Sequence, residues 1–555
     1  MMCWIFPILS FGISVVTANS FFEPLVVKLD NATFTGVYEG PLLKFLGIPY
    51  AQPPIADLRF RLPQSLPPYN GSHLAINSGP SCPQLGPGLP VVGGNATNWL
   101  NDLNSTFSIL ADVVFGPISE DCLTIDIIKP ANIISETNLP VVVWFIAGGF
   151  EYGSSSMLDG GVIVQRSIEL NEPIIYVSMN FRQNAFGFLA SQQVKDAGVG
   201  NIGLYDQRLA LRWVQKYIAA FGGDPTRVTI WGDSAGAISA ALQMLTNGGN
   251  SEGLFRAAFM QSGSSVPLED ITRGQAYYDD IVSRTNCGGF NDTLACLRTI
   301  PYDDLQAAID NSPRISSYQS AQLAWLPRVD GVFLTKTPTE LVDEDSVAQI
   351  PFISGNCDDE GTFFSFANSN VTTDSEFREY ITQYWLSTTN SSVIDSIMEL
   401  YPSNITLGSP FDTGSANALT PQFKRLAAFQ GDIVFHGPRR YFVQQRAQSG
   451  KQKVWSYLSK RLKWLPYLGS AHASDVLNVY GPGDMTDYLI RFVVNLDPNV
   501  GSQANAAFYW PEYTLQDKQL LTFLDDVAAP LAISTDTYRS QALSYVSKVE
   551  STCCV

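Results

Sequence analysis

Short hydrophobic runs recur along the chain, and segments with the periodicity of helices separate many of them. Eight of these runs are rich in β-branched and aromatic residues, as buried strands are. They cover residues 42–50, 123–130, 141–147, 174–180, 228–231, 256–262, 352–356 and 454–459. Strands that alternate with helices predict a large, mostly parallel sheet with helices on both faces, so we expect an α/β fold.

The clearest helical pattern is the segment YDQRLALRWVQKYIAAFGG, residues 205–223. Every fourth position on one face carries a leucine or an aromatic residue, namely Leu209, Trp213, Tyr217 and Phe221. The pair Gly222-Gly223 predicts where this helix ends. No internal repeat, low-complexity tract or proline- and serine-rich linker divides the chain, so we expect one large domain over residues 19–555.

The first twenty residues, MMCWIFPILSFGISVVTANS, contain no Asp, Glu, Lys or Arg. Their apolar core is too short to span a bilayer comfortably, and Val16-Thr17-Ala18 has the small-residue pattern of a cleavage site. We expect residues 1–18 to be a signal peptide, although the usual basic n-region is missing. No later run is long and apolar enough for a membrane helix, so we expect no integral membrane segment.

Eight N-x-S/T sequons are spread over the chain, and so many together point to a glycosylated surface. They begin at Asn31, Asn70, Asn95, Asn104, Asn291, Asn370, Asn390 and Asn404. Taken with the leader, they predict a secreted protein. The sequence does not distinguish a monomer from a homodimer, and we expect one of these two states.

The composition is that of a folded, acidic protein. Hydrophobic residues make up 45% of the chain and charged residues 15%, which excludes a disordered chain. The net charge of −18 repels nucleic acid and anionic membranes, so we expect no nucleic-acid partner. The chain has three histidines and neither an HExxH nor a CxxC motif. The sequence therefore predicts no metal site.

Two short motifs suggest other chemistry but lack its context. The segment GVGNIG, 198–203, fits a dinucleotide-binding pattern, yet no strand precedes it and no acidic residue follows at the required distance. The segment FDTGS, 411–415, contains the D-T-G-S of pepsin-like proteases. Those enzymes need two aspartates from two such loops, and the chain has one, so we expect a polar turn.

Cysteine pairing is only partly constrained by the sequence. Of eight cysteines, Cys3 leaves with the leader, so at least one of the remaining seven is unpaired or pairs outside the chain. In an oxidising compartment the near neighbours Cys287 and Cys296 suggest a disulfide that closes a short loop, and Cys82 and Cys122 suggest one that closes a larger loop. The sequence alone does not fix this connectivity, and it leaves Cys357, Cys553 and Cys554 open.

A candidate nucleophile lies in VTIWGDSAGAISA, residues 228–240, where a strand runs into a helix-compatible segment. GDSAG fits G-x-S-x-G, and a strand before and a helix after are what a nucleophile elbow requires. Small residues at 232, 235 and 236 keep the Ser234 hydroxyl clear of the sheet. The backbone N–H of Ala235 lies at a helix N-terminus, which favours negative charge.

A serine nucleophile needs a base and an orienting acid, and in this fold the chain order is serine, acid, histidine. His73 comes too early. His436 lies within a long amphipathic helix pattern, where we expect a structural histidine. His472, in the small-residue loop LGSAHASDV after a strand, is the favoured base. Three acids follow the strand at 352–356, and position alone does not separate Asp358, Asp359 and Glu360.

Ordered blocks over almost the whole mature chain resemble the type-B carboxylesterase/lipase family, and most of all its secreted fungal lipases. The blocks are FLGIPYAQPP with LRFRLP, SEDCLTIDIIKP, GNIGLYDQRLALRWVQKYIAAFGGDP, GDSAGA, NCDDEGTFF and HASD. The resemblance implies the α/β-hydrolase fold and hydrolysis of carboxylic esters by a serine, without a cofactor.

The resemblance also implies roles for particular residues. The Glu of DEG is the acid in this family, which implies a catalytic triad of Ser234, Glu360 and His472. The implied oxyanion hole combines the N–H groups of Gly148, Gly149 and Ala235. The residues implied to bind the substrate are Phe150, Phe363 and Phe364, of which Phe363 and Phe364 are implied to lie near an acyl channel. The implied disulfides are Cys82–Cys122 and Cys287–Cys296.

Two departures from the family pattern concern the site. Ile146-Ala147-Gly148-Gly149-Phe150 stands where many relatives have His-Gly-Gly-Gly-Phe, and alanine restricts the dihedral angles of the loop. Asp233 stands where glutamate is usual, so the acid beside the nucleophile is one methylene shorter. We therefore expect the shape of the oxyanion hole and the support of the elbow to differ from the family pattern.

The loop between Cys82 and Cys122 carries apolar residues at helical spacing, namely Trp99, Leu103, Phe107, Leu110 and Val114. A lid-like segment at about 83–121 would cover an apolar pocket and present an apolar face to a lipid–water interface when it opens. The alternative is an ordinary helix packed on the core. If Asn95 and Asn104 are glycosylated, their glycans flank this helix.

The expected activity is hydrolysis of apolar small-molecule or lipid esters, as in a lipase or sterol esterase with broad carboxylesterase activity. One alternative is an esterase for short-chain or phenolic esters, of the feruloyl type. A different class of alternative is a non-catalytic adhesion or binding protein on the same fold, since fold alone does not establish function. All three triad positions are filled here, which favours an enzyme.

Overall fold

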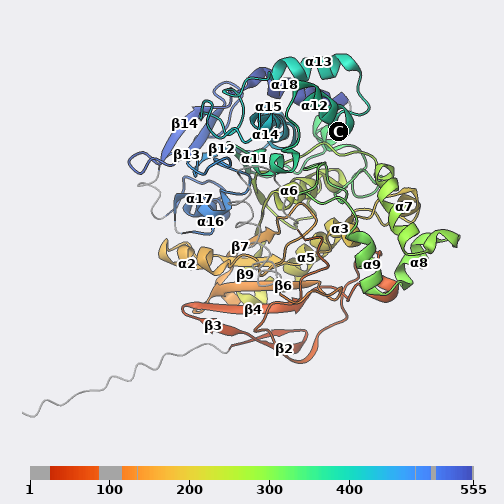
Figure 1. Cartoon of the computed structure of the whole chain (residues 1–555). Helices are drawn as coiled ribbons and strands as arrows, with labels where there is room; N and C mark the ends of the chain where they lie inside the picture. The colour runs from red at the N-terminus through yellow and green to blue at the C-terminus, as the bar shows by residue number, and fades with distance from the viewer. Residues whose placement is uncertain (1–24, 87–115, 134, 482, 502–507, 553–555) are drawn as a thin grey trace, which may run out of the picture.

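The structure is a computed structural model that describes residues 25–86, 116–133, 135–481, 483–501 and 508–552 (Figure 1). Its central feature is an eleven-stranded sheet with the order β14-β13-β12-β11-β10-β9-β7-β8-β6-β4-β3. From β8 to β13 all neighbouring strands pair in parallel, and antiparallel pairs occur at both edges. The predicted large, mostly parallel sheet is therefore confirmed.

The eleven strands overlap every hydrophobic run that the sequence predicts as a strand. They are β3 (Val37–Glu39), β4 (Leu42–Pro49), β6 (Thr124–Pro130), β7 (Leu139–Phe145), β8 (Ile175–Met179), β9 (Gly223–Asp233), β10 (Ala257–Gln261), β11 (Phe352–Cys357), β12 (Val454–Lys460), β13 (Gln519–Leu524) and β14 (Leu531–Thr535). A separate sheet has the order β1-β2-β5, from β1 (Val26–Leu29), β2 (Asn31–Thr35) and β5 (Asn70–Leu74).

Helices cover both faces of the central sheet (Figure 1). Helices α2 and α17 contact each other on one side, where α2 packs on β6 and β8 and α17 packs on β7 and β9. Helices α5 and α6 pack together on the other side. The helices are α2 (Gly161–Glu169), α3 (Asn184–Phe188), α4 (Gln192–Asp196), α5 (Ile202–Tyr217), α6 (Ala235–Leu245), α7 (Gln275–Arg284), α8 (Thr293–Thr299), α9 (Tyr302–Ile309), α10 (Pro338–Asp343), α11 (Thr362–Ser365), α12 (Asp374–Tyr380), α13 (Ser391–Leu400), α14 (Phe423–Gly431), α15 (Gly437–Ser449), α16 (Val476–Val479), α17 (Asp484–Asn495) and α18 (Ser540–Thr552).

Helix α5 is the helix that the four-residue repeat predicts, with its start three residues earlier. A 3-10 turn over Ile218–Phe221 extends it, and Gly222 ends it with φ +88°, a conformation that favours glycine. Within the repeat, Trp213 and Phe221 are buried. The segment before the helix, which resembles a dinucleotide motif, is a turn in which Asn201 has φ +51° at the helix N-cap.

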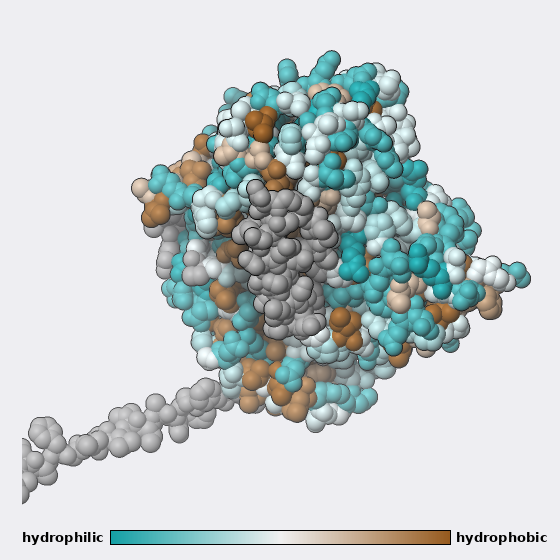
Figure 2. All heavy atoms as spheres, in the orientation of Figure 1, coloured by the Kyte–Doolittle hydropathy of each residue, from teal (hydrophilic) through white to brown (hydrophobic). Residues whose placement is uncertain are grey.

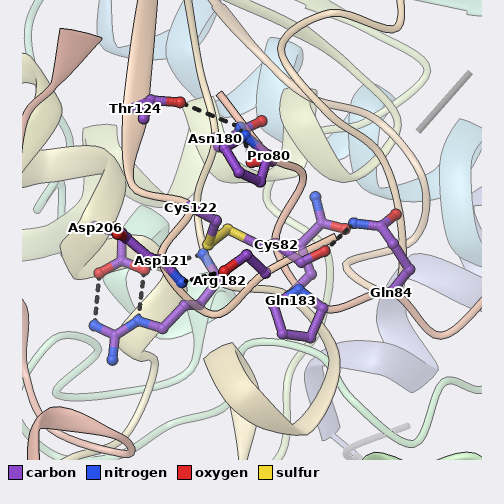
Figure 3. The surroundings of a disulfide bond; sticks show 12 residues. Pro80, Cys82, Gln84, Asp121, Cys122, Thr124, Asn180, Arg182, Gln183 and Asp206 are labelled. Atoms are coloured by element: carbon purple, nitrogen blue, oxygen red, sulfur yellow. Dashed lines mark hydrogen bonds and ion pairs between the residues drawn. A yellow bond between two sulfur atoms is a disulfide. The ribbon is translucent and has the colours of Figure 1, made fainter. Parts of the chain in front are cut away.

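Two disulfides join the cysteines that the resemblance pairs, Cys82 with Cys122 and Cys287 with Cys296. The first lies where β6 begins, and Figure 3 shows its polar surroundings, including the buried ion pair of Arg182 and Asp206. Cys357 is buried and free. Cys553, Cys554 and residues 87–115, with most of the lid-like segment, lie outside the described residues.

Hydrophilic residues predominate on the face of the molecule shown in Figure 2, and hydrophobic side chains lie there in small separate groups. Six of the eight sequon asparagines are exposed, namely Asn31, Asn70, Asn291, Asn370, Asn390 and Asn404. Asn95 and Asn104 lie outside the described residues. Within the described part of the chain, no helix combines the length and the hydrophobicity of a membrane span.

Candidate active site

Ser234 occupies a sharp turn between the end of β9 and the start of α6. Its backbone has φ +53° and ψ −123°, a conformation that typically costs about 1–3 kcal/mol and is often found at functional sites. The turn leaves no room for larger neighbours, because a Cβ on Gly236 would lie 2.1 Å from the carbonyl oxygen of Phe145. The Ser234 N–H donates to the carbonyl oxygen of Gln261 at 2.9 Å, which fixes the turn against β10.

The Ser234 hydroxyl contacts the favoured histidine and, through it, one of the three candidate acids. His472 Nε2 lies 2.8 Å from Ser234 Oγ, and His472 Nδ1 lies 2.6 Å from Glu360 Oε2. A buried carboxylate accepts hydrogen bonds, so we assign the proton to Nδ1, and Nε2 then accepts from the serine hydroxyl. Ser234 is 8% exposed and Glu360 is 1% exposed, so the chain of hydrogen bonds is largely shielded from water.

A further set of hydrogen bonds holds the Glu360 carboxylate. Its Oε1 accepts from the Cys357 N–H at 2.8 Å and from the Asn356 side-chain amide at 3.2 Å. The Asn356 Oδ1 in turn accepts from Arg439 Nε at 2.9 Å, and Arg439 forms a fully buried ion pair with Asp536. No local motif in the sequence pointed to Asn356, Arg439 or Asp536, because α15 and the chain after β14 meet β11 only in the fold.

The other acids and histidines that the sequence offers lie in different surroundings. Asp358 and Asp359 both form ion pairs with Lys463, at 2.8 and 2.6 Å. His436 is buried with Nδ1 3.0 Å from the Tyr538 hydroxyl, and burial lowers its pKa well below the usual value. His73 is exposed on β5, and its Nε2 lies 2.8 Å from the carbonyl oxygen of Asn70.

The loop after β7 carries the other candidate oxyanion donors. Gly148, Gly149 and Phe150 have φ of +105°, +63° and +60°, and a Cβ on Gly148 would lie 2.0 Å from the Tyr152 carbonyl oxygen. Ala147 has no positive φ, so its side chain does not strain the loop at the position where relatives have glycine. Among the described residues, the N–H groups of Gly148, Gly149 and Ala235 donate to no acceptor. Gly149 and Ala235 line the same cavity as Ser234.

Asp233, the second departure from the family pattern, is fully buried beneath the nucleophile. Neither of its carboxyl oxygens has a hydrogen-bond partner among the described residues. Burial, with the nearby carboxyls of Asp475 and Glu360, raises the pKa of Asp233 well above its usual value. The shorter acid thus forms no direct hydrogen bond to the elbow, and its burial favours the neutral form of the carboxyl group.

An apolar cavity opens beside the Ser234 hydroxyl. Phe150 and Phe364 line it, whereas Phe363 is half-buried and outside the lining, with its ring centroid 5.6 Å from that of Phe364. The Phe364 and Phe435 rings lie 5.1 and 4.4 Å from the His472 ring, so they confine the imidazole. The described residues contain no cluster of three or more His, Cys, Asp or Glu side chains placed to hold a metal ion.

A serine on a strand–helix turn, bonded to a histidine that a buried carboxylate orients, is the arrangement of the serine hydrolases. The comparisons with known proteins then identify the family. The model of the carboxylesterase family matches residues 23–542, and the chain belongs to this family. It is a carboxylic ester hydrolase with the α/β-hydrolase fold.

Curated fungal lipases are similar over almost their whole length. Lipase 4 of Diutina rugosa is 40% identical, with 96% of each chain covered. The secreted triacylglycerol lipase LIP1 of Gibberella zeae is 38% identical, over 94% of this chain and 90% of the relative. Among solved structures, EstA of Aspergillus niger matches with a TM-score of 0.80 at 28% identity, covering 96% of this chain and 99% of that one.

Proposed function

We propose that this protein is a secreted lipase or sterol esterase that hydrolyses apolar esters through Ser234, His472 and Glu360. The observation that carries the proposal is an apolar cavity directly beside the hydroxyl of a serine that is hydrogen-bonded to His472. Residues 19–555 act as one catalytic domain. The exposure of six sequon asparagines supports glycosylation, and the similarity to secreted lipase 1 of Botryotinia fuckeliana supports secretion.

In the proposed mechanism His472 Nε2 takes the hydroxyl proton as Ser234 Oγ attacks the ester carbonyl. Glu360 keeps the other proton on Nδ1 and stabilises the imidazolium. The negative charge that develops on the carbonyl oxygen is stabilised by the N–H groups of Gly149 and Ala235, with Gly148 shaping the loop. Loss of one such donor typically costs about 10²–10³ in turnover.

The tetrahedral intermediate then collapses, and His472 returns the proton to the leaving alcohol. The acyl group remains on Ser234 as an ester until a water molecule, deprotonated by His472, attacks it. A second tetrahedral intermediate releases the carboxylic acid and restores the serine hydroxyl. The same base and the same backbone donors serve both halves of the reaction.

The cavity favours an aliphatic acyl group over a polar one. Burial of one CH₂ group contributes about 0.8 kcal/mol, which is about fourfold in an equilibrium constant. We therefore expect kcat/KM to rise with each added carbon of a saturated acyl chain until the cavity is filled. This increase supports a lipase or sterol esterase, whereas an esterase for short-chain or phenolic esters would lose activity beyond short chains.

The test is a panel of p-nitrophenyl esters from two to sixteen carbons, with triolein, a cholesteryl ester and methyl ferulate, assayed on the wild type and on Ser234→Ala. We expect activity on long-chain esters and on at least one of the two lipids, and none in the variant, with its thermal unfolding unchanged. Near-wild-type turnover in Ser234→Ala would refute the nucleophile. Hydrolysis restricted to short chains or to methyl ferulate would refute the lipase assignment.

A further inference from the structure

A second cavity adjoins the apolar cavity of the active site. The two cavities share a wall formed by Pro267, Leu268, Gln322, Leu323, Leu326 and Trp385. On the far side of this wall the lining becomes polar and charged, with Glu269, Arg273 and Arg328 among its residues. We call this second space the Arg328 cavity.

Arg328 is an unpaired cation in a buried position. The residue is 7% exposed, its Nε is buried without a hydrogen-bond partner, and its guanidinium forms no ion pair with any described residue. Every other buried arginine among the described residues pairs with a carboxylate. These are Arg59, Arg182, Arg208, Arg425, Arg439, Arg440, Arg446 and Arg491. Burying a guanidinium without a counter-ion is unfavourable, so the position favours an anion.

The backbone at Arg328 is fixed without help from its side chain. The Asn201 side chain accepts from the Arg328 N–H at 2.9 Å and donates to the Arg328 carbonyl oxygen at 2.7 Å. The next residue, Val329, donates to the carbonyl oxygen of Glu269 and accepts from the N–H of Ile271, both at 2.9 Å. Because these contacts hold the backbone, the guanidinium is presented at the Arg328 cavity by a rigid support.

The other charges of the Arg328 cavity neutralise each other. Arg273 Nε donates to the Glu269 carboxylate at 2.9 Å, and the Glu269 charge also favours the charged form of Arg328, so the three charged residues of the lining leave one net positive charge. Tyr277 and Gln319, which also line the cavity, hydrogen-bond to each other and add no charge. A ligand with a single negative charge therefore fits this cavity better than a neutral or a dianionic one.

We propose that the Arg328 cavity binds the carboxylate of a free carboxylic acid, with Arg328 as its counter-ion. A guanidinium matches a carboxylate with two parallel hydrogen bonds. The apolar side chains of the shared wall, Leu268, Leu323 and Leu326, provide contacts for a short alkyl group. That the acid is the product of hydrolysis rests on the proposed function, because the product forms on the other side of this wall. The binding of a carboxylate does not rest on it.

The test measures binding to the Ser234→Ala protein by isothermal titration calorimetry, with sodium hexanoate as the probe. Hexan-1-ol serves as its neutral analogue and inorganic phosphate as a dianion. We expect saturable binding of hexanoate. The dissociation constants of the alcohol and of phosphate should be higher than that of hexanoate by a factor of about ten or more. The double variant Ser234→Ala/Arg328→Gln should bind hexanoate at least about tenfold more weakly.

A matched control removes an exposed arginine outside this cavity. Arg284 on α7 pairs with Asp280, and Arg284→Gln should leave hexanoate binding unchanged. If Arg328→Gln does not fold, Arg328→Lys keeps the charge and should retain binding that the neutral Arg328→Met loses. Absence of saturable binding, equal binding of phosphate, or binding that Arg328→Gln leaves unchanged would each overturn the proposal. Hexanoate binding in a protein whose wild type hydrolyses no ester would refute only the proposed function.

Discussion

Replacing Glu360 by glutamine tests the proposed triad with almost no change in shape. In the native site Glu360 Oε1 accepts two hydrogen bonds, at 2.8 and 3.2 Å, and Oε2 accepts one from His472 at 2.6 Å. The glutamine amide has one acceptor oxygen. Asn356 cannot turn its amide to suit the new side chain, because its Oδ1 is bound by Arg439.

The amide of Glu360→Gln therefore satisfies two donors by placing its oxygen toward Cys357 and Asn356, and its NH₂ group then faces His472 Nδ1. His472 accepts at Nδ1, so its proton moves to Nε2, which no longer accepts from the serine hydroxyl. In a serine protease, replacing the triad aspartate by asparagine gives the same incorrect histidine tautomer and lowers kcat by about 10⁴. We expect a loss of about 10³–10⁴ in kcat, or roughly 4–5.5 kcal/mol of activation free energy.

The assay follows initial rates on p-nitrophenyl butyrate from pH 6 to 9, with thermal unfolding monitored by circular dichroism. Asp358→Asn is the matched control, because Asp358 lies two residues before Glu360 in the chain but pairs with Lys463 rather than with His472. It should keep kcat within a few-fold of the wild type, even if it unfolds at a lower temperature. A folded Glu360→Gln protein with a kcat within tenfold of the wild type would refute the role of Glu360.

Three further predictions concern the surroundings of the site. Gly236→Ala should abolish activity and lower the unfolding temperature, because the new Cβ would lie 2.1 Å from the Phe145 carbonyl oxygen, and an unchanged unfolding temperature would contradict this. Burial raises the pKa of Glu151 to about 8 from 4.5, so its contribution to stability is complete below pH 4.5 and is lost as the pH rises to 8. The free energy of unfolding of Glu151→Gln relative to the wild type, measured with urea, should therefore be higher at pH 8 than at pH 5 by several kcal/mol. Phe364→Ala should lower kcat/KM for octanoyl esters more than for acetyl esters, and equal losses would place Phe364 outside the acyl contacts.

The central sheet could be predicted from the sequence because its inner strands are buried on both faces and are nearly continuous hydrophobic runs. The strands of the small sheet could not, since β5 is fully exposed and β1 alternates between exposed and buried positions. At the site, the signal of Ser234 is local and lies in five consecutive residues. The contacts of Asn356 with Arg439, and the free charge of Arg328, depend on segments far apart in the chain and have no local signal.

The three consecutive acids after β11 show why position alone did not identify the partner of His472. All three are buried, and each has a different task. Asp359 binds the histidine loop through the Ser470 N–H at 2.9 Å, and its own N–H donates to the Ser470 carbonyl oxygen at 2.9 Å. Lys463 joins Asp358 and Asp359 to the same loop. Asp359, which is bound to the Ser470 backbone as well as to Lys463, therefore sets the distance between the acid loop and the histidine loop, which is what allows Glu360 to reach His472 with a short hydrogen bond.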